Sequence, residues 1–253
     1  MTHLGDCYYL RFRRHDASSA AIAFIACARR VDLCGESVCA MISLTPARTR
    51  CSRATRSAAA CIEAVRAMQP AGPERLLGYS FGGLVAFEMA RQLLAEGKHV
   101  SFPGLRDAPL SHRGTGRTTT HAEMLTMLAE DIGLSPFALP AGSIAEILAL
   151  ARTAGPVPPD FPVAQAERMA AVHFNTARVA ACYEPQGTLA VPAPQARAIQ
   201  GAASQVDWSS LLAGAVEAHD FDCTHRGLIA ADIAPVLAAT IARALPAMEI
   251  CSG

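Results

Sequence analysis

A single serine lies in a glycine-rich turn between an apolar segment and an amphipathic segment. Residues 76–83 read LLGYSFGG, in which Gly78, Ser80 and Gly82 fit the pattern G-x-S-x-G. The pattern by itself is weak evidence, but a strand before it and a helix after it are typical of a nucleophile elbow. In such an elbow the glycines permit a sharp backbone turn, and the serine hydroxyl stands above the end of the sheet. We therefore predict that Ser80 is a nucleophile.

A serine hydroxyl is a poor nucleophile at neutral pH, so Ser80 requires a base. The chain has eight histidines, and His225 lies between the predicted last strand and the predicted last helix. A base at that position keeps the chain order of serine, aspartate and histidine that accompanies a nucleophile elbow. His219 falls within the predicted strand, where it is expected to pack in the sheet. His225 is therefore the predicted base.

Two aspartates follow candidate strands and could orient the base. Asp107 follows the strand after the nucleophile helix, and Asp207 follows the next strand. Asp207 lies 225 − 207 = 18 residues before His225, which is short for an intervening helix, strand and loop. Asp107 is favoured and Asp207 remains the alternative. Either carboxylate would hold the imidazole tautomer and stabilise the imidazolium without taking the proton.

Strands and helices alternate along most of the chain, as required to position these side chains at one edge of a sheet. Such alternation predicts an α/β fold with a mostly parallel sheet and helices on both faces. Proline is disfavoured in a central strand, yet Pro103 and Arg106 interrupt the one expected after the nucleophile helix. The predicted strands are 8–12, 37–44, 75–79, 100–106, 189–199 and 215–222, and the predicted helices are 19–30, 55–69, 82–96 and 231–245.

The alternation stops between residues 115 and 183, where the sequence offers no convincing strand. Thr120 and Glu123, and likewise Ser143 and Glu146, have the spacing of capping boxes, so each pair predicts the start of a helix. Gly155 is a plausible stop for the second of these helices, and a third is expected over 165–182. The sequence therefore predicts a helical insertion within one domain of residues 1–253.

Composition excludes several classes of function. Apolar residues make up 51% of the 253 residues, and the 22 basic and 22 acidic residues cancel without forming a dense basic cluster. A nucleic-acid interface is therefore not expected. The nine cysteines form no C-x-x-C pair, which argues against a zinc site and for reduced thiols in a cytoplasmic protein.

Neither a membrane span nor a leader is expected. No apolar run approaches the roughly 20 residues that a membrane-spanning helix needs. Residues 11–28 (RFRRHDASSAAIAFIACA) imitate a secretory signal, but their apolar part is short.

The stretch GPERLLGYSFGGLVAFEMARQL (residues 72–93), together with Asp107-Ala108-Pro109-Leu110, resembles the releasing thioesterase domains of nonribosomal peptide and polyketide synthetases. The resemblance is strong over 57–97 and weakest over 29–56. It implies an α/β-hydrolase fold without a metal or cofactor of its own. It also implies that an acyl chain passes to serine from the phosphopantetheine arm of an acyl or peptidyl carrier protein, and then to water or an internal nucleophile.

The resemblance also implies an oxyanion hole and a lid. One backbone N–H donor is expected from Phe81, directly after the nucleophile, and the second from Ala17 in the loop after the first strand. Residues 115–183 correspond to the family's lid over Ser80. Its apolar faces would line an acyl chamber or pack the helices onto the domain; they include Met124, Leu125, Leu128, Ile147, Leu148, Met169 and Phe174.

Three rival functions remain open on the sequence. An editing thioesterase would clear short acyl groups from misprimed carriers, and a general carboxylesterase would use the same residues on esters. A degenerate copy would dock a carrier protein without turnover. The Tyr-Ser-Phe-Gly-Gly sequence at 79–83 favours the releasing class, because editing enzymes more often have His before the serine and Met after it.

Overall fold

The computed structural model of this chain describes most of residues 52–240 and three strands that precede them. The described ranges are 7–13, 22–27, 37–43, 52–68, 74–108, 120–131, 134, 142–155, 157–191, 195–200, 208–213, 217–230, 232–233, 235–237 and 239–240. Within these ranges no helix is both long enough and apolar enough to cross a bilayer.

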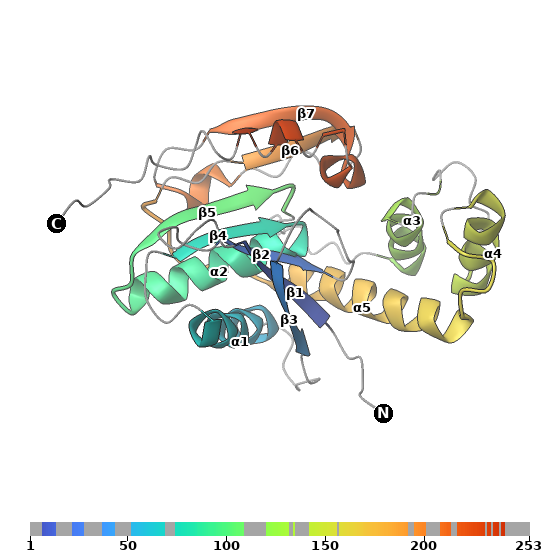
Figure 1. The fold of residues 1–253 in the computed structure, drawn as a ribbon, viewed down its shortest axis with the longest axis horizontal. Coiled ribbons are helices and arrows are strands. Elements are labelled where there is room, and N and C mark those ends of the chain that lie inside the picture. Colours follow the sequence, from blue (N-terminus) through green and yellow to red (C-terminus); the bar gives the residue numbers. More distant parts are fainter. Residues whose placement is uncertain are drawn as a thin grey trace.

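A seven-stranded sheet forms the centre of the described structure, in the order β3-β1-β2-β4-β5-β6-β7 (Figure 1). Each strand from β2 through β7 in this order is parallel to its neighbour, whereas β1 runs antiparallel to both β2 and β3. The strands are β1 (Cys7–Arg13), β2 (Ile22–Cys27), β3 (Ser37–Ser43), β4 (Glu74–Tyr79), β5 (Val100–Arg106), β6 (Gln195–Gln200) and β7 (Ala218–Thr224).

The helix predicted over 19–30 is wrong, because residues 22–27 form strand β2. The strand pairs with β1 on one side and with β4 on the other, so it is an interior strand of the sheet. Interior strands covered on both faces have continuous apolar runs without alternation, and such a run cannot be told from a buried helix by periodicity. The sequence IAFIAC fits that description, and its alanines misled the prediction.

Strand β5 contains the proline that argued against a central strand. Pro103 lies opposite Leu76 of β4, whereas β5 pairs with β6 only at Leu105 and Arg106. The proline is thus on a part of β5 that has one ladder neighbour, and a missing N–H is tolerated where a strand has an unpaired side. The strand prediction is confirmed despite its unfavourable composition.

Helices cover one face of the sheet and form the larger hydrophobic core. The helix α1 (Ser52–Met68) packs against α2 (Phe81–Ala95), which lies on β4, β5 and β2. The end of α2 is a Schellman motif, in which the Lys98 N–H donates to Leu93 O and Gly97 has a φ of 73°. Side chains from both helices and the sheet meet in this core, including Ile62, Leu76, Leu84, Phe87, Met89, Leu105 and Trp208.

The other face of β6 and β7 is covered by the segment after β7. Because β6 alternates its side chains, Ala196 and Ala198 point away from the larger core and meet Phe221 of β7. The 3₁₀ helix η3 (Arg226–Ile229) contributes Leu228, and Leu237 lies in a helical stretch beyond it. The predicted α/β architecture is therefore confirmed, with helical segments on both faces.

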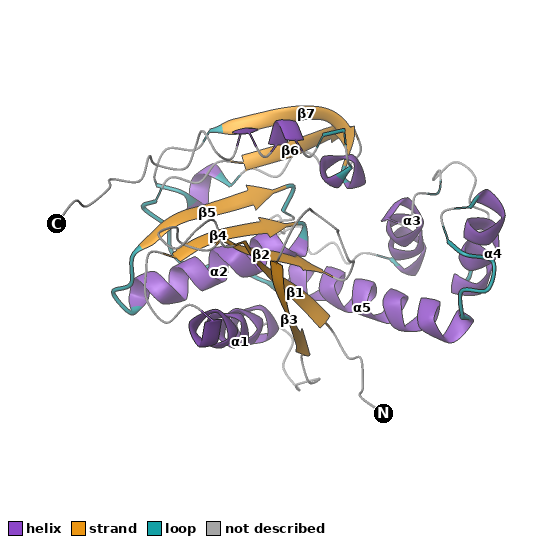
Figure 2. Ribbon diagram, in the orientation of Figure 1, coloured by secondary structure: helices purple, strands orange, loops and turns teal. Residues whose placement is uncertain are grey.

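Three helices occupy the region in which no strand was expected, and the first two lie beside the N-terminal half of the third, away from the sheet (Figures 1 and 2). They are α3 (His121–Asp131), α4 (Ile144–Ala154) and α5 (Val163–Cys182). Both predicted capping boxes are present: the Glu123 N–H donates to Thr120 Oγ1 over 3.2 Å, and the Glu146 N–H donates to Ser143 Oγ over 3.3 Å. Gly155 ends α4 with a φ of 87°, as predicted.

The apolar faces of these helices mostly pack against one another. Leu125, Leu128 and Ile147 are buried in one small cluster, on which Phe174 packs, while Leu148 belongs to a second cluster. The helical region thus has cores of its own, separate from the core under the sheet. Of the seven residues considered for an acyl chamber, these five are used for packing, Met124 is half-buried, and the Met169 side chain lies outside the described residues.

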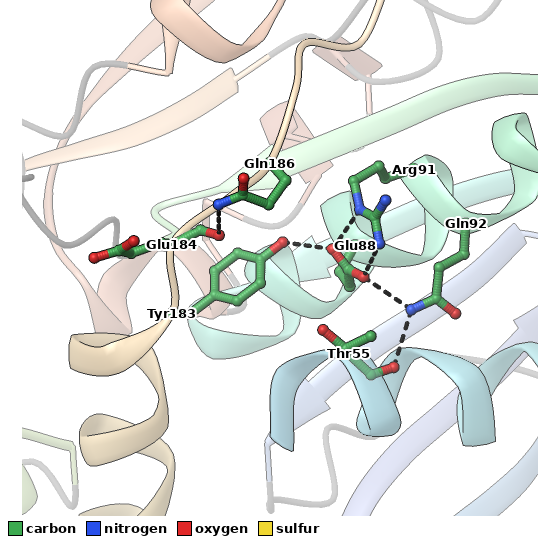
Figure 3. A network of polar contacts seen from close by, with 7 residues as sticks. All are labelled: Thr55, Glu88, Arg91, Gln92, Tyr183, Glu184 and Gln186. Carbon is green, nitrogen blue, oxygen red and sulfur yellow. Dashed lines mark hydrogen bonds and ion pairs between the residues drawn. The ribbon is translucent and has the colours of Figure 1, made fainter. Parts of the chain in front are cut away.

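A buried carboxylate ties the base of α5 to the helix that follows Ser80 (Figure 3). Glu88 is 2% exposed and accepts a 2.7 Å hydrogen bond from the hydroxyl of Tyr183, directly after α5. Arg91 donates two hydrogen bonds to the same carboxylate, and Gln92 donates to it while also reaching the carbonyl of Thr55 in α1. Three helices therefore meet at one charged group.

Hydrogen bonding makes the contribution of Glu88 to stability dependent on pH. Burial alone would raise the pKa of Glu88, but hydrogen bonds from Arg91, Gln92 and Tyr183 outweigh it and hold the pKa below its ordinary value of 4.5. A depressed pKa in the folded state means that the stabilisation is fully present above about pH 4.5. It is lost as the pH falls through the folded-state pKa.

We predict that Glu88→Gln lowers the free energy of unfolding by about 2 kcal/mol at pH 7, because it breaks a buried ionic network. The loss is expected to shrink as the pH falls below 4.5 and through the folded-state pKa of Glu88, which lies lower still. Urea denaturation at pH 7 and at acid pH measures both values. Glu96→Gln is the matched control: Glu96 pairs with Arg66 on the surface, and its loss is expected to cost less than about 1 kcal/mol. Equal costs at the two positions would contradict this account.

Candidate active site

Ser80 stands at the junction of β4 and α2 with a strained backbone. Its φ is 54° and its ψ is −132°, and it is one of two described non-glycine residues with positive φ. Ser80 is also the N-cap of α2, a position where serine normally accepts a hydrogen bond from the helix, yet its side chain makes no capping bond. A strained serine whose hydroxyl does not cap its helix is a feature of a functional site rather than of a structural turn.

Close approach of α2 to the sheet explains two of the surrounding glycines. A Cβ on Gly78 would lie 2.2 Å from the carbonyl oxygen of Gly82, and a Cβ on Gly83 would lie 2.5 Å from the Cβ of Ala108. Both distances are shorter than any real carbon contact, and the first obstacle is backbone that cannot move aside. Glycine is therefore required by the packing of α2 against β4 and against the residue after Asp107.

Strain at Ser80 gives a stability prediction that does not depend on catalysis. We expect Ser80→Gly to be more stable than Ser80→Ala by about 1 kcal/mol, because glycine adopts positive φ without steric cost. Ser210, an exposed residue of the 3₁₀ helix η2 (Ser209–Leu211) without positive φ, is the matched control. There the alanine variant is expected to be the more stable one. Thermal unfolding of the four variants tests the prediction, and the same order at both sites would contradict it.

The structure brings His225 and Asp107 into direct contact. His225 directly follows β7 and Asp107 directly follows β5, and the distance from His225 Nδ1 to Asp107 Oδ2 is 2.5 Å. Asp107 is 4% exposed and His225 is 27% exposed, so the carboxylate lies beneath the ring and the ring faces outward. A carboxylate that accepts a hydrogen bond from Nδ1–H leaves Nε2 as the acceptor, which is the tautomer a general base requires.

Backbone contacts fix the Asp107 carboxylate. Asp107 has a φ of 45°, its N–H donates to Ala196 O over 2.7 Å, and its Oδ1 accepts from the Ala198 N–H over 3.4 Å. Aspartate is one of the few residues that tolerate positive φ. Strand β6 therefore holds Asp107 in the conformation that presents Oδ2 to His225.

A contact with Tyr79 was not found by sequence reasoning. The Tyr79 ring stacks on the His225 imidazole with the ring centroids 4.7 Å apart and the planes 19° from parallel. Its hydroxyl donates to the carbonyl oxygen of His225 over 3.0 Å. The two residues are 146 positions apart, and the sequence offers no pattern that would pair them.

Of the other predicted site residues, the structure describes Phe81 but not Ala17 or Asp207. Phe81 is the first residue of α2, where the dipole of a helix is positive. Ala17 and Asp207 lie outside the described residues. Strand β2 begins level with Arg75, at the other end of β4 from Ser80, so the described strands do not favour an oxyanion donor from the segment between β1 and β2.

A metal centre finds no support among the described residues, which contain no group of three or more His, Cys, Asp or Glu side chains able to hold an ion. His219 lies within β7, as predicted, and its Nε2 is 3.2 Å from a Glu217 carboxylate oxygen. Ser80, Asp107 and His225 each directly follow a parallel strand, so they lie at the carboxyl-terminal edge of the sheet.

Comparison with known proteins places this site in context. A family model for the thioesterase domain matches residues 33–245. CymA of Salinispora arenicola, described as a probable non-canonical nonribosomal peptide synthetase, is 39% identical over 100 residues, which are 37% of this chain. The chain spans about 1% of the length of that relative.

Solved structures with similar folds are thioesterase domains. The NocB thioesterase domain from the nocardicin cluster, in covalent complex with a fluorophosphonate nocardicin G analogue, is 25% identical with a TM-score of 0.51, over 77% of this chain and 76% of that one. The thioesterase domain SrfTE, described in the cyclisation of the lipopeptide antibiotic surfactin, is 16% identical with a TM-score of 0.54, over 83% of this chain and 80% of that one. The second likeness concerns the fold alone, and the fold is that of the α/β-hydrolases.

Proposed function

Because the chain belongs to the thioesterase domain family, we propose that it is a serine thioesterase that releases a peptidyl or polyketide chain from a carrier protein. The family acts as hydrolases on thioesters, and the relatives are nonribosomal peptide synthetases. The observation that carries the proposal is the His225–Asp107 contact at the same sheet edge as the strained Ser80.

The proposed reaction has two steps. In the first, His225 Nε2 takes the proton of Ser80 as its oxygen attacks the thioester carbonyl, and Asp107 stabilises the resulting imidazolium. The backbone N–H of Phe81, at the start of α2, is the proposed donor to the oxyanion. The family resemblance implies a second donor at Ala17, but β2 begins at the other end of β4 from Ser80, so the proposal assigns no second donor. The tetrahedral intermediate collapses, the carbon–sulfur bond breaks, and His225 protonates the departing pantetheine thiolate.

In the second step the acyl-serine ester is opened. Water or a nucleophile within the acyl chain attacks the ester carbonyl while His225 accepts its proton, and His225 then returns a proton to Ser80. This chemistry uses no metal or cofactor of the domain itself. Release therefore gives a free acid when water attacks, or a ring when the acyl chain attacks itself.

The helical region is proposed as a lid over Ser80 within a single domain of residues 1–253. Helices α3 and α4 lie at the far end of α5 with small cores of their own, and α5 is anchored to α2 through Tyr183 and Glu88 (Figures 1 and 3). A unit packed within itself and joined to the sheet domain at the base of one helix is suited to move relative to the sheet. A lid over residues 115–183 would enclose a bulky acyl chain.

We predict that kcat/KM rises with acyl size and with delivery on a carrier protein, because remote binding energy positions the carbonyl near Ser80. Shortening the acyl group to acetyl is expected to lower kcat as well as to raise KM. A kinetic series from acetyl to long-chain and peptidyl pantetheine thioesters, free and carrier-bound, measures this. If acetyl-carrier is the best substrate, the editing function replaces the releasing function.

The same series addresses the other rivals. A general carboxylesterase would hydrolyse simple esters as fast as thioesters of the same acyl group and would gain nothing from a carrier. A degenerate docking copy would bind a carrier without serine-dependent turnover. The strained elbow and the buried carboxylate under His225 favour activity over docking alone, since strain of this kind is retained for a functional purpose.

A further inference from the structure

We propose that Tyr79 is a positioning residue for His225, which it holds through its ring and its hydroxyl. This inference rests on the proposed function, in which His225 is the general base. The supporting observations are the stacked rings, 4.7 Å apart and 19° from parallel, and the 3.0 Å hydrogen bond from the Tyr79 hydroxyl to the His225 carbonyl.

The sheet explains how the residue before the nucleophile reaches the histidine. A Cβ on Gly78 would point toward α2. Because side chains alternate along β4, the side chain of the next residue, Tyr79, points to the opposite face of the sheet. There it packs against the smaller core of β6, β7 and η3, whose members include Phe221, Cys223 and Leu228. His225 lies between β7 and η3, the two elements that form that core with β6, and its ring stacks on Tyr79.

The two contacts act on different parts of His225. The hydrogen bond holds its backbone carbonyl at the point where the chain leaves β7, so it restrains the Cα position. Stacking restrains the plane of the ring, whose edge is already bound to Asp107 through Nδ1. The stacked Tyr79 ring and the bond from Nδ1 to Asp107 together fix the direction in which Nε2 points.

Stacking also suits the charge that His225 acquires. The face of a tyrosine ring is negative, so it attracts a cation placed over it. In the proposed reaction His225 becomes an imidazolium when it accepts the proton of Ser80. Tyr79 therefore favours the charged form at the moment of the transition state, and it also links the elbow to the base because its neighbour in the chain is Ser80.

The test compares Tyr79→Phe and Tyr79→Leu, using turnover of an acyl-pantetheine thioester and the rate of phosphonylation by a fluorophosphonate probe. Tyr79→Leu loses both contacts, and we expect kcat to fall about 10- to 100-fold with KM nearly unchanged. Tyr79→Phe keeps the stacked ring and is expected to recover most of the loss, remaining about 2- to 10-fold below the wild type. The phosphonylation rate is expected to fall in parallel with kcat.

Ile62→Ala is the matched control, because it removes a buried side chain of α1, a helix that carries no residue of the proposed site. It is expected to lower thermal stability while leaving kcat unchanged. A fall in kcat that merely follows stability in all three variants would contradict the proposal.

A double-mutant cycle with His225→Ala decides whether Tyr79 acts through His225. If it does, Tyr79→Leu is expected to have no further effect on the residual phosphonylation rate of His225→Ala. The same 10- to 100-fold loss in both backgrounds would overturn the inference and leave the proposed function intact. A His225→Ala enzyme that keeps its full rate would contradict the proposed function instead, whatever Tyr79→Leu does.

Discussion

Replacing Ser80 with alanine is expected to reduce turnover of an acyl-pantetheine thioester by about 10⁶-fold, the loss typical of a removed serine nucleophile. Ser80 has a strained backbone that an idle turn residue would not need, and the start of α2 packs so closely on β4 and on Ala108 that only glycine fits at positions 78 and 83. The protein is expected to fold normally, since Ser80 makes no capping bond that alanine would lose.

The control for this experiment is Ser210→Ala. Ser210 is exposed, lies in η2 and belongs to no part of the proposed site. It is expected to keep wild-type kcat and KM. A Ser80→Ala protein that turns over at more than a small fraction of the wild-type rate would show that another residue is the nucleophile.

The second large effect is expected at Asp107. Asp107→Asn is predicted to lower kcat by about 10⁴-fold, because an amide can donate to Nδ1 and so favours the wrong imidazole tautomer. Asparagine is the informative replacement because residue 107 has a φ of 45°, which asparagine tolerates and alanine does not. The variant is expected to bind substrate with nearly unchanged KM, since the carboxylate lies beneath the ring of His225.

Asp207→Asn is the matched comparison, because Asp207 is the rival acid on sequence grounds. The contact of Asp107 with His225 supports a much smaller effect at Asp207. Steady-state kinetics of the two variants, with circular dichroism to check folding, gives the ranking. If Asp207→Asn is the more damaging change, the acid is Asp207, and the editing function gains support.

Much of the candidate site could be predicted because its residues carry local patterns. The elbow consists of consecutive residues around Ser80, and Gly97 marks the Schellman motif that ends helix α2. His225 and Asp107 each directly follow a predicted strand, β7 and β5, although Pro103 and Arg106 interrupt the apolar run of β5. Parallel strands bring their carboxyl ends to one edge, so the order of strands is enough to place these residues near one another.

Residues before α1 were harder to interpret because their arrangement depends on pairing rather than on local pattern. The apolar run 22–27 is compatible with either a helix or an interior strand, and its pairing with β4, some fifty residues later, selects the strand. Because residues 22–27 form a strand, β1 and β2 are consecutive in the chain and pair antiparallel. The expected oxyanion donor at Ala17 came from the family resemblance, and Ala17 lies outside the described residues.

Contacts between distant residues could not be read from the sequence at all. Tyr79 meets His225, and Glu88 meets Tyr183, only after the sheet and the helices have been assembled. A tyrosine before a serine, or a glutamate within an amphipathic helix, has an ordinary interpretation as a core or surface residue. Their importance here follows from burial and from specific partners, both of which are properties of the fold.

The most direct test of the central claim is intact-protein mass spectrometry after incubation with a panel of acyl-pantetheine thioesters, followed by peptide mapping of any adduct. The account predicts that the protein gains the mass of one acyl group, that the modified peptide carries it on Ser80, and that Ser80→Ala gains nothing. His225→Ala is expected to acquire the adduct far more slowly than the wild type. An adduct mapped to any other residue, or turnover by a protein that lacks Ser80, would contradict the account.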